Sequence, residues 1–219
     1  MVELLVFDVN ETLLNLHPLR RQFEATYGGA VSLGEWFARM LHGSLLANAL
    51  DQYRPFDVIG AEALQGLAGR AGHDITMDEA RVAVEPLATA PPHPDVVPAL
   101  SRLAESGQRM IALTNGSTDV ANIQVDSAGL RDYLERVISV EEVGRFKPDP
   151  TPYRYAADQM GLDMDQMMLV ASHDWDCAGA MNAGAQAAFV ARSGVTWGLP
   201  SEPPHLIVAD LGELADRVV

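Results

Sequence analysis

The first residues that could carry chemistry lie in FDVNETLL, Phe7–Leu14, where an apolar run leads into a polar cluster. Asp8 is followed by Asn10 and by Thr12, whose hydroxyl could orient the carboxylate. A carboxylate at the end of a buried strand can cap a helix, bind a ligand or attack an electrophile as a nucleophile. The rest of the sequence has to distinguish these roles.

Other polar groups also follow apolar runs of the kind that form buried strands. Thr114 and Asn115 end one such run, Lys147 lies in EEVGRFKPDPTPY after the next, and SHDWD, residues 172–176, follows another. Ligands in open parallel sheets bind beyond the carboxyl ends of the strands. We therefore expect these groups to converge with Asp8 on one site, which favours catalysis over a simple helix cap.

Six short apolar segments predict the strands that would position these groups, and amphipathic segments between them predict helices. Strands alternating with helices indicate an α/β fold with a doubly wound parallel sheet. The predicted strands are Leu4–Phe7, Arg109–Thr114, Arg136–Val140, Met168–Ser172, Ala187–Ala191 and Leu206–Val208. The helices of this part are Val96–Ser106, Thr118–Ala128, Pro152–Met160 and Asp176–Ala183.

The segment after the first strand has a different pattern. Residues 15–92 contain no convincing strand, and the stiff run APPHP, residues 90–94, marks a boundary after them. We therefore predict a core domain of residues 1–14 and 93–219 with an all-helical domain, residues 15–92, inserted into it. Its predicted helices are Pro18–Tyr27, Ser32–Leu50, Val58–Ala71 and Met77–Leu87.

Composition limits the partners. The chain has 219 residues, of which 48% are hydrophobic, and its formal net charge of -15 disfavours nucleic acid and anionic membranes as partners. A small anionic substrate would need a local concentration of cations. The single Cys177 cannot form an internal disulfide, and the first apolar run is too short to cross a membrane. We expect a cytoplasmic protein.

The motifs together resemble the haloacid dehalogenase superfamily, in the expected order and over nearly the whole chain. They are a strand ending in DxxxT, a second ending in TNG, a lysine before a proline, and a fourth strand leading to an acid. The resemblance implies a Rossmann-like core and identifies the helical insertion as a cap domain over the active aspartate. Most members are magnesium-dependent phosphatases, and a minority are 2-haloacid dehalogenases.

Two positions distinguish these branches. Phosphatases of this type place a second aspartate two residues after the nucleophile as a general acid, a contribution of roughly 10²–10⁴ in rate. Here that residue is Asn10, which cannot donate such a proton. Metal-binding acids usually follow the fourth strand as D-x-x-x-D, but here Ser172 takes the first position and only Asp176 remains. Both changes favour the dehalogenase branch, which needs neither group.

The resemblance to (S)-2-haloacid dehalogenases implies roles for individual residues. Asp8 matches the nucleophile and Thr12 the hydroxyl that orients it, while Lys147 would keep Asp8 ionised. Arg39, in LGEWFARML, matches a cap arginine associated with halide departure, and Asp176 matches the acid linked to ester hydrolysis. Substrate contacts are implied for a further set: Asn10, Thr114, Asn115, Tyr153, Ser172, His173 and Trp175.

The sequence also departs from the family pattern. The usual aromatic residue and glycine after the nucleophile are replaced by Asn10 and Glu11, and the serine and asparagine of the fourth motif by Ala171 and His173. Glu11 would weaken anion binding unless its side chain is paired or turned away. His173 has two interpretations, a base or a structural histidine.

These observations predict hydrolytic removal of halide from a short 2-haloalkanoic acid through an aspartyl ester, giving a 2-hydroxy acid. No metal or organic cofactor is implied, and the resemblance suggests a homodimer. Two alternatives stay open: a magnesium-dependent phosphatase acting on a small phosphate ester, and a relative that has lost catalysis and serves as a binding protein. The halogen, the chain length and the ability to expel fluoride are left open by the sequence.

Overall fold

The computed structural model of this protein describes residues 2–192, 194–200 and 202–219. Within them lies a six-stranded sheet whose neighbouring strands are all parallel, in the order β3-β2-β1-β4-β5-β6. This order, with helices between the strands, confirms the predicted doubly wound α/β fold. The strands are β1 (Leu4–Phe7), β2 (Arg109–Thr114), β3 (Arg136–Ser139), β4 (Met167–Ala171), β5 (Gln186–Val190) and β6 (Leu206–Val208).

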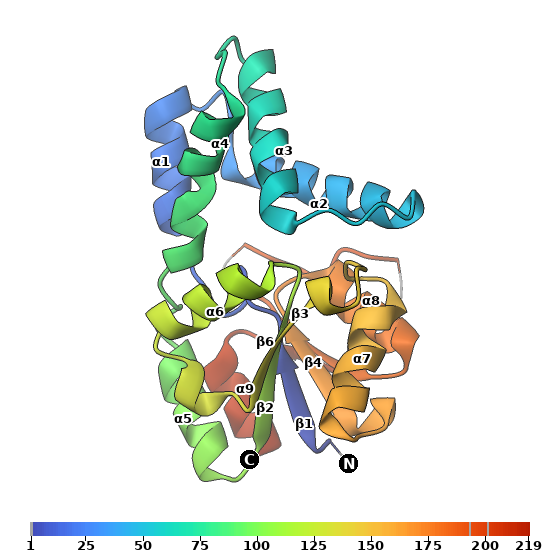
Figure 1. Cartoon of the computed structure of the whole chain (residues 1–219). Helices are drawn as coiled ribbons and strands as arrows, with labels where there is room; N and C mark the ends of the chain where they lie inside the picture. Colours follow the sequence, from blue (N-terminus) through green and yellow to red (C-terminus); the bar gives the residue numbers. More distant parts are fainter. Residues whose placement is uncertain (1, 193, 201) are drawn as a thin grey trace.

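Helices cover both faces of the sheet (Figure 1). Because side chains alternate along a strand, β1 sends Leu5 and Phe7 to one face and Leu4 and Val6 to the other. All four are buried, as expected for a strand in the middle of a parallel sheet. The first face packs against α5 (Val96–Glu105), α6 (Thr118–Ser127) and α9 (Leu211–Val218), and the second against α7 (Pro150–Met160) and α8 (Asp174–Ala183).

The predicted helices did not include α9. This helix has only eight residues, but Leu211, Leu214, Ala215 and Val218 follow the apolar spacing of a helix, and the segment carries a local start signal. The Asp210 side chain accepts a hydrogen bond from the backbone N–H of Glu213 at 2.9 Å, which caps the helix. Elsewhere the differences are small: β4 ends at Ala171, so Ser172 already belongs to the loop, and α7 and α8 each begin two residues earlier than predicted.

The chain between β1 and α5 is helical, and these helices form a separate group beside the sheet (Figure 1). Helix α2 lies nearest the carboxyl end of β1 in this view. That the group acts as a cap stays a prediction. Its members are α1 (His17–Tyr27), α2 (Leu33–Ala49), α3 (Phe56–Arg70), α4 (Met77–Val84) and the 3₁₀ helix η1 (Glu85–Thr89).

The two connections between this helical group and the sheet run side by side. The backbone N–H of Asn15 donates to the Pro91 carbonyl at 2.7 Å, and that of His93 donates to the Leu13 carbonyl at 2.9 Å. These pairs lie at the expected domain boundaries, although the division into two domains itself stays a prediction. No helix in the described part of the chain is long and apolar enough to span a bilayer.

Candidate active site

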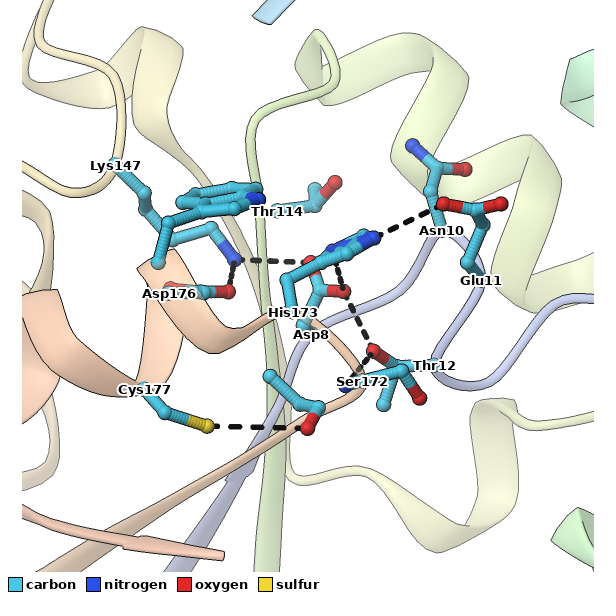
Figure 2. A network of polar contacts seen from close by, with 12 residues as sticks. Asp8, Asn10, Glu11, Thr12, Thr114, Lys147, Ser172, His173, Asp176 and Cys177 are labelled. Carbon is cyan, nitrogen blue, oxygen red and sulfur yellow. Dashed lines mark hydrogen bonds and ion pairs between the residues drawn. The ribbon is translucent and has the colours of Figure 1, made fainter. Parts of the chain in front are cut away.

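Asp8 lies directly after β1 and is 5% exposed. Its two carboxylate oxygens accept from different donors: Oδ1 from Lys147 Nζ at 2.9 Å and Oδ2 from Thr12 Oγ1 at 2.7 Å (Figure 2). The Thr12 hydroxyl itself accepts from the backbone N–H of Ser172 at 2.9 Å, so its single proton is directed to Asp8. The carboxylate is therefore held in one orientation by groups from three strand ends.

Lys147 is the only lysine in the chain, and it is 1% exposed. Its ammonium donates three hydrogen bonds: to Asp8 Oδ1 at 2.9 Å, to Asp176 Oδ2 at 2.6 Å and to the Leu113 carbonyl at 2.9 Å. An ammonium has three donors, so all of them are used. The loop that carries Lys147 is fixed as well, since its backbone N–H donates to Asn115 Oδ1 at 2.9 Å.

Asp176, in the first turn of α8, is fully buried. Its Oδ2 accepts from Lys147 at 2.6 Å and its Oδ1 accepts from the Tyr153 hydroxyl, also at 2.6 Å. Burial and the nearby Asp176 carboxylate raise the pKa of the Tyr153 phenol well above its ordinary value, so the phenol stays protonated and donates. Each oxygen of Asp176 is thus already bound by a strong donor.

The pKa values of the two buried acids, Asp8 and Asp176, are shifted in opposite directions. Burial acts to raise the pKa of Asp8, but the Lys147 ammonium, His173 and two hydrogen bonds outweigh it and lower this pKa below its ordinary value. For Asp176 burial prevails over Lys147, and its pKa is raised. Burial acts to lower the pKa of Lys147, yet the two carboxylates raise it, so the ammonium stays charged. Asp8 is therefore a buried, ionised carboxylate, as a carboxylate nucleophile must be.

His173 lies over Asp8 and contacts two acids (Figure 2). Its Nε2 is 3.0 Å from Glu11 Oε2, and its Nδ1 is 3.6 Å from Asp8 Oδ2. Its ring stacks on Trp175, with centroids 5.2 Å apart, and meets Phe37 of α2 at 5.4 Å. The sequence predicted that Glu11 would weaken anion binding unless its side chain is paired or turned away. In the structure its carboxylate is paired with His173.

The backbone at Glu11 has a φ of 60°, the left-handed region that favours glycine. The related pattern has glycine at this position, and a side chain there costs roughly 1–2 kcal/mol. Burial raises the pKa of the Glu11 carboxyl, and the nearby His173 acts to lower it. The strained backbone therefore carries a side chain that is bound to the ring above Asp8.

The other side chains predicted to contact the substrate fall into two groups, those already hydrogen-bonded within the protein and those without a partner. Asn10 Oδ1 accepts from Gln124 Nε2 at 2.9 Å, and Thr114 Oγ1 accepts from the Gly116 backbone N–H at 3.1 Å. By contrast, Asn115 Nδ2 and Ser172 Oγ are buried and have no hydrogen-bond partner among the described residues. Buried polar atoms are nearly always paired in proteins, so these two donors point to a polar ligand.

Arg39 is the one predicted catalytic residue that the structure does not bring into this network. It lies half-buried on α2, and no hydrogen bond or ion pair of its side chain occurs within residues 2–192, 194–200 and 202–219. Residues on a helix are separated by about 100°, so Arg39 lies about 200° around the axis from Phe37. Phe37, on the other side of α2, meets the His173 ring, and the apolar spacing of Trp36, Phe37 and Met40 was its sequence signal.

Two cavities lie beside these groups. One, of about 720 Å³, is lined by Glu11, Ser172, His173 and Trp175 together with the cations Arg20 and Arg192. The other, of about 660 Å³, is mostly apolar and is lined by residues of the helical group and of α6, with Asn10 between them. Arg192 is already paired with Asp95 at 3.0 Å, and the acids Glu11, Asp95 and Asp174 line the same cavity.

The fold and the site are those of a known class of hydrolases. A family model described as haloacid dehalogenase-like hydrolase matches residues 2–184, and the chain belongs to this family. The chain is 32% identical to (S)-2-haloacid dehalogenase H-109 of Pseudomonas putida, with 98% of this chain and 97% of the relative covered. It is 28% identical to haloacetate dehalogenase H-2 of Moraxella sp. (strain B), with 94% and 93% covered.

Solved structures agree with the sequence relatives. L-2-haloacid dehalogenase from Xanthobacter autotrophicus with chloropropionic acid covalently bound is 26% identical and superposes with a TM-score of 0.92, covering 100% of this chain and 98% of the other. These relatives identify the protein, within its family, as a dehalogenase-like hydrolase.

Proposed function

We propose that the protein hydrolyses short 2-haloalkanoic acids through an ester formed on Asp8. The observation that carries this proposal is the buried Lys147 ammonium, bonded to Asp8 at 2.9 Å and to Asp176 at 2.6 Å. This ammonium keeps Asp8 ionised at neutral pH, and burial keeps competing water away from the attacking oxygen. The named relatives act on 2-haloacids, and one of them has been solved with chloropropionic acid covalently bound, which supports the same chemistry here.

In the first half-reaction an Asp8 oxygen attacks the carbon that bears the halogen, from the side opposite the halide. A C–O bond forms, the C–X bond breaks, and the halide leaves with the bonding pair, so the configuration at that carbon inverts. Halides are weak bases, so no general acid is required. This explains how the site can work with Asn10 in place of a proton donor.

The unpaired donors are proposed to bind the substrate carboxylate. Asn115 Nδ2 and Ser172 Oγ are buried and free to donate, and the Thr114 hydroxyl, which accepts from Gly116, keeps its own proton for donation. Hydrogen bonds to a carboxylate are about twice as strong as neutral ones. Binding the substrate there would place the halogen-bearing carbon against Asp8. Trp175 lines the adjacent cavity, whereas Tyr153 is fully buried and would act on the substrate only through Asp176.

The phosphatase alternative fits these residues less well. Both oxygens of Asp176 already accept short hydrogen bonds, from Lys147 and Tyr153, and Ser172 stands where a metal-binding acid is usual. Mg²⁺ prefers oxygen ligands in a near-ideal octahedron, so this donor set does not suit it. Asn10 is bound to Gln124 and cannot protonate an alkoxide.

The proposal is tested by two assays on the same protein. Chloride release from (S)-2-chloropropionate is measured with a metal chelator present, and phosphate release from a small phosphate ester with magnesium present. We expect chloride release and no phosphate release. Asp8→Asn should abolish the activity, whereas Asp158→Asn, the same change at an exposed site on α7, should not. Phosphate release, or release of neither product, would refute the proposal.

Several finer predictions accompany this function. We propose that residues 15–92 act as a cap on a core of residues 1–14 and 93–219, and the paired connections at Leu13–His93 and Asn15–Pro91 support this division. The role of Arg39 in halide departure requires its side chain to reach the leaving halide, on the side of the substrate carbon opposite Asp8, and Arg39→Ala measures whether halide release depends on it. The homodimer and the cytoplasmic location stay predictions, which sedimentation and cell fractionation would test.

A further inference from the structure

We infer that Asn48, near the C-terminal end of α2, is a positioning residue that holds the loop of Lys147 and so sets where the ammonium of this lysine lies. The inference rests on the proposed function, because it concerns the group that keeps Asp8 ionised. The motifs in the sequence did not indicate Asn48. The contacts between α2 and the Lys147 loop carry the inference.

The loop between β3 and α7 has no regular structure at Arg145 and Phe146, so its course depends on the partners of its backbone groups. The Asn48 side chain supplies two of them. Its Oδ1 accepts from the Phe146 backbone N–H at 2.9 Å, and its Nδ2 donates to the Phe146 carbonyl at 2.8 Å. A carboxamide bonded to both polar groups of one residue restrains both its position and its rotation. Phe146 directly precedes Lys147, so these two hydrogen bonds act one residue from the catalytic group.

Packing strengthens the same contact. The Phe146 side chain is fully buried, and the rings of Tyr53 and Phe56 lie with their centroids 5.1 Å and 5.7 Å from its own. Tyr53 belongs to the connection between α2 and α3, and Phe56 begins α3. Arg145 adds a hydrogen bond to the Asn48 carbonyl at 3.0 Å. The loop before Lys147 is therefore attached to the helical group by hydrogen bonds and by a buried ring.

The position of this loop determines what the ammonium can reach (Figure 2). On the side of the sheet, the Lys147 backbone N–H donates to Asn115 Oδ1 at 2.9 Å. The ammonium itself makes three hydrogen bonds of 2.6–2.9 Å, and such bonds weaken steeply as their geometry departs from the optimum. A misplacement of about 1 Å can cost roughly 10²-fold in rate. Asn48 thus acts on Asp8 through Lys147, and the charge of the nucleophile depends on the helical group as well as on the sheet.

The position of the ammonium can be measured directly, because Lys147 is the only lysine in the chain. Protein grown with lysine labelled at its side-chain nitrogen gives one ammonium signal by NMR, and exchange of its protons with water should be slow while they are buried and bonded. Asn48→Leu removes both hydrogen bonds at similar volume, and we expect this exchange to become roughly 10-fold faster or more. Asn182→Leu, the same substitution at an exposed asparagine of α8, is the matched control and should leave it unchanged.

The same variants are then assayed for chloride release from (S)-2-chloropropionate over a range of pH. For Asn48→Leu we expect kcat to fall roughly 10- to 10²-fold with little change in KM. The acid limb of the rate profile should move to higher pH, because an ammonium that is held less firmly lowers the pKa of Asp8 less. The other titratable groups around Asp8 are His173, Glu11 and Asp176, and these are the same in every variant.

A second variant keeps the test open where Asn48→Leu does not fold. Asn48→Asp retains the acceptor for the Phe146 N–H and loses only the donor, so its ammonium exchange and kcat should lie between those of the unchanged protein and Asn48→Leu. The ammonium signal reports on Lys147 itself, so a general loss of stability that leaves Lys147 bound would not change it.

Unchanged ammonium exchange together with an unchanged acid limb in the folded Asn48 variants would overturn the inference, whatever the change in kcat. The proposed function fails separately, if the unchanged protein releases no chloride. In that case faster ammonium exchange in the Asn48 variants would still show that Asn48 holds Lys147, and unchanged exchange would overturn this inference as well.

Discussion

Replacing Lys147 by methionine removes the one ammonium between two buried carboxylates. The Lys147 side chain is 0% exposed, and those of its partners Asp8 and Asp176 are 7% and 0% exposed. Removing one partner of a buried ion pair costs about 3–5 kcal/mol, because it leaves a charge without compensation. Methionine matches the length of the lysine stem, so the loss comes from charge rather than from volume. At about 2–4 °C per kcal/mol for a chain of this size, we expect the melting temperature to fall by roughly 6–20 °C.

The dependence of this loss on pH has a defined sign. In the unchanged protein the pKa of Asp8 is lowered, so its contribution to stability is present above the unfolded pKa and is lost as pH falls through the folded one. In Lys147→Met the two carboxylates repel each other and one must take up a proton, so the folded pKa rises. The variant should therefore become more stable from pH 8 to pH 5, a range in which the stability that Asp8 adds to the unchanged protein is still present.

Urea unfolding at pH 5, 6, 7 and 8 measures this difference, with Arg154→Met as a control that removes an exposed cation. Chloride release by Lys147→Met should fall at least 10²-fold at pH 7, since a protonated carboxyl is a poor nucleophile. If Lys147→Met instead loses less than about 1 kcal/mol, the usual size for a surface pair, the ammonium does not hold these two charges. That result would refute the electrostatic account of Asp8.

Three further changes test individual contacts. Thr12→Val removes the donor to Asp8 Oδ2 and should lower kcat about 10-fold or more with little change in KM, as steady-state kinetics would show. Tyr153→Phe leaves Asp176 Oδ1 without its donor and should destabilise the protein by about 1.5–3 kcal/mol in urea unfolding. Phe37→Ala removes a buried aromatic side chain that meets the His173 ring and should destabilise the protein by roughly 3–5 kcal/mol, as urea unfolding would show.

Most elements of the fold could be predicted from the sequence because their signals are local. The buried strand LLVF and the apolar spacing of α2 are visible in windows of a few residues. The parallel sheet follows from the alternation of such segments, and its geometry brings the strand ends to one edge. For this reason Asp8, Thr12, Lys147 and Asp176 could be placed in one site without coordinates.

The partners within that site could not be predicted, because they depend on side-chain directions over long sequence separations. The Asp8–Lys147 contact spans 139 residues and the Glu11–His173 contact spans 162. A rotation of about 200° on α2 separates Phe37, which contacts His173, from Arg39, and a family pattern does not show which of them faces inward.

The sequence by itself determined that a carboxylate, a lysine and a second acid meet at the carboxyl edge of a parallel sheet. The hydrophobic pattern determines which segments form strands. Because these strands are parallel, their carboxyl ends lie along one edge of the sheet. Only the tertiary structure decided that Glu11 holds the imidazole above Asp8 and that Asp176 has both oxygens bound. Such contacts depend on distances of a few ångströms, and these arise only when the helices and the sheet are packed together.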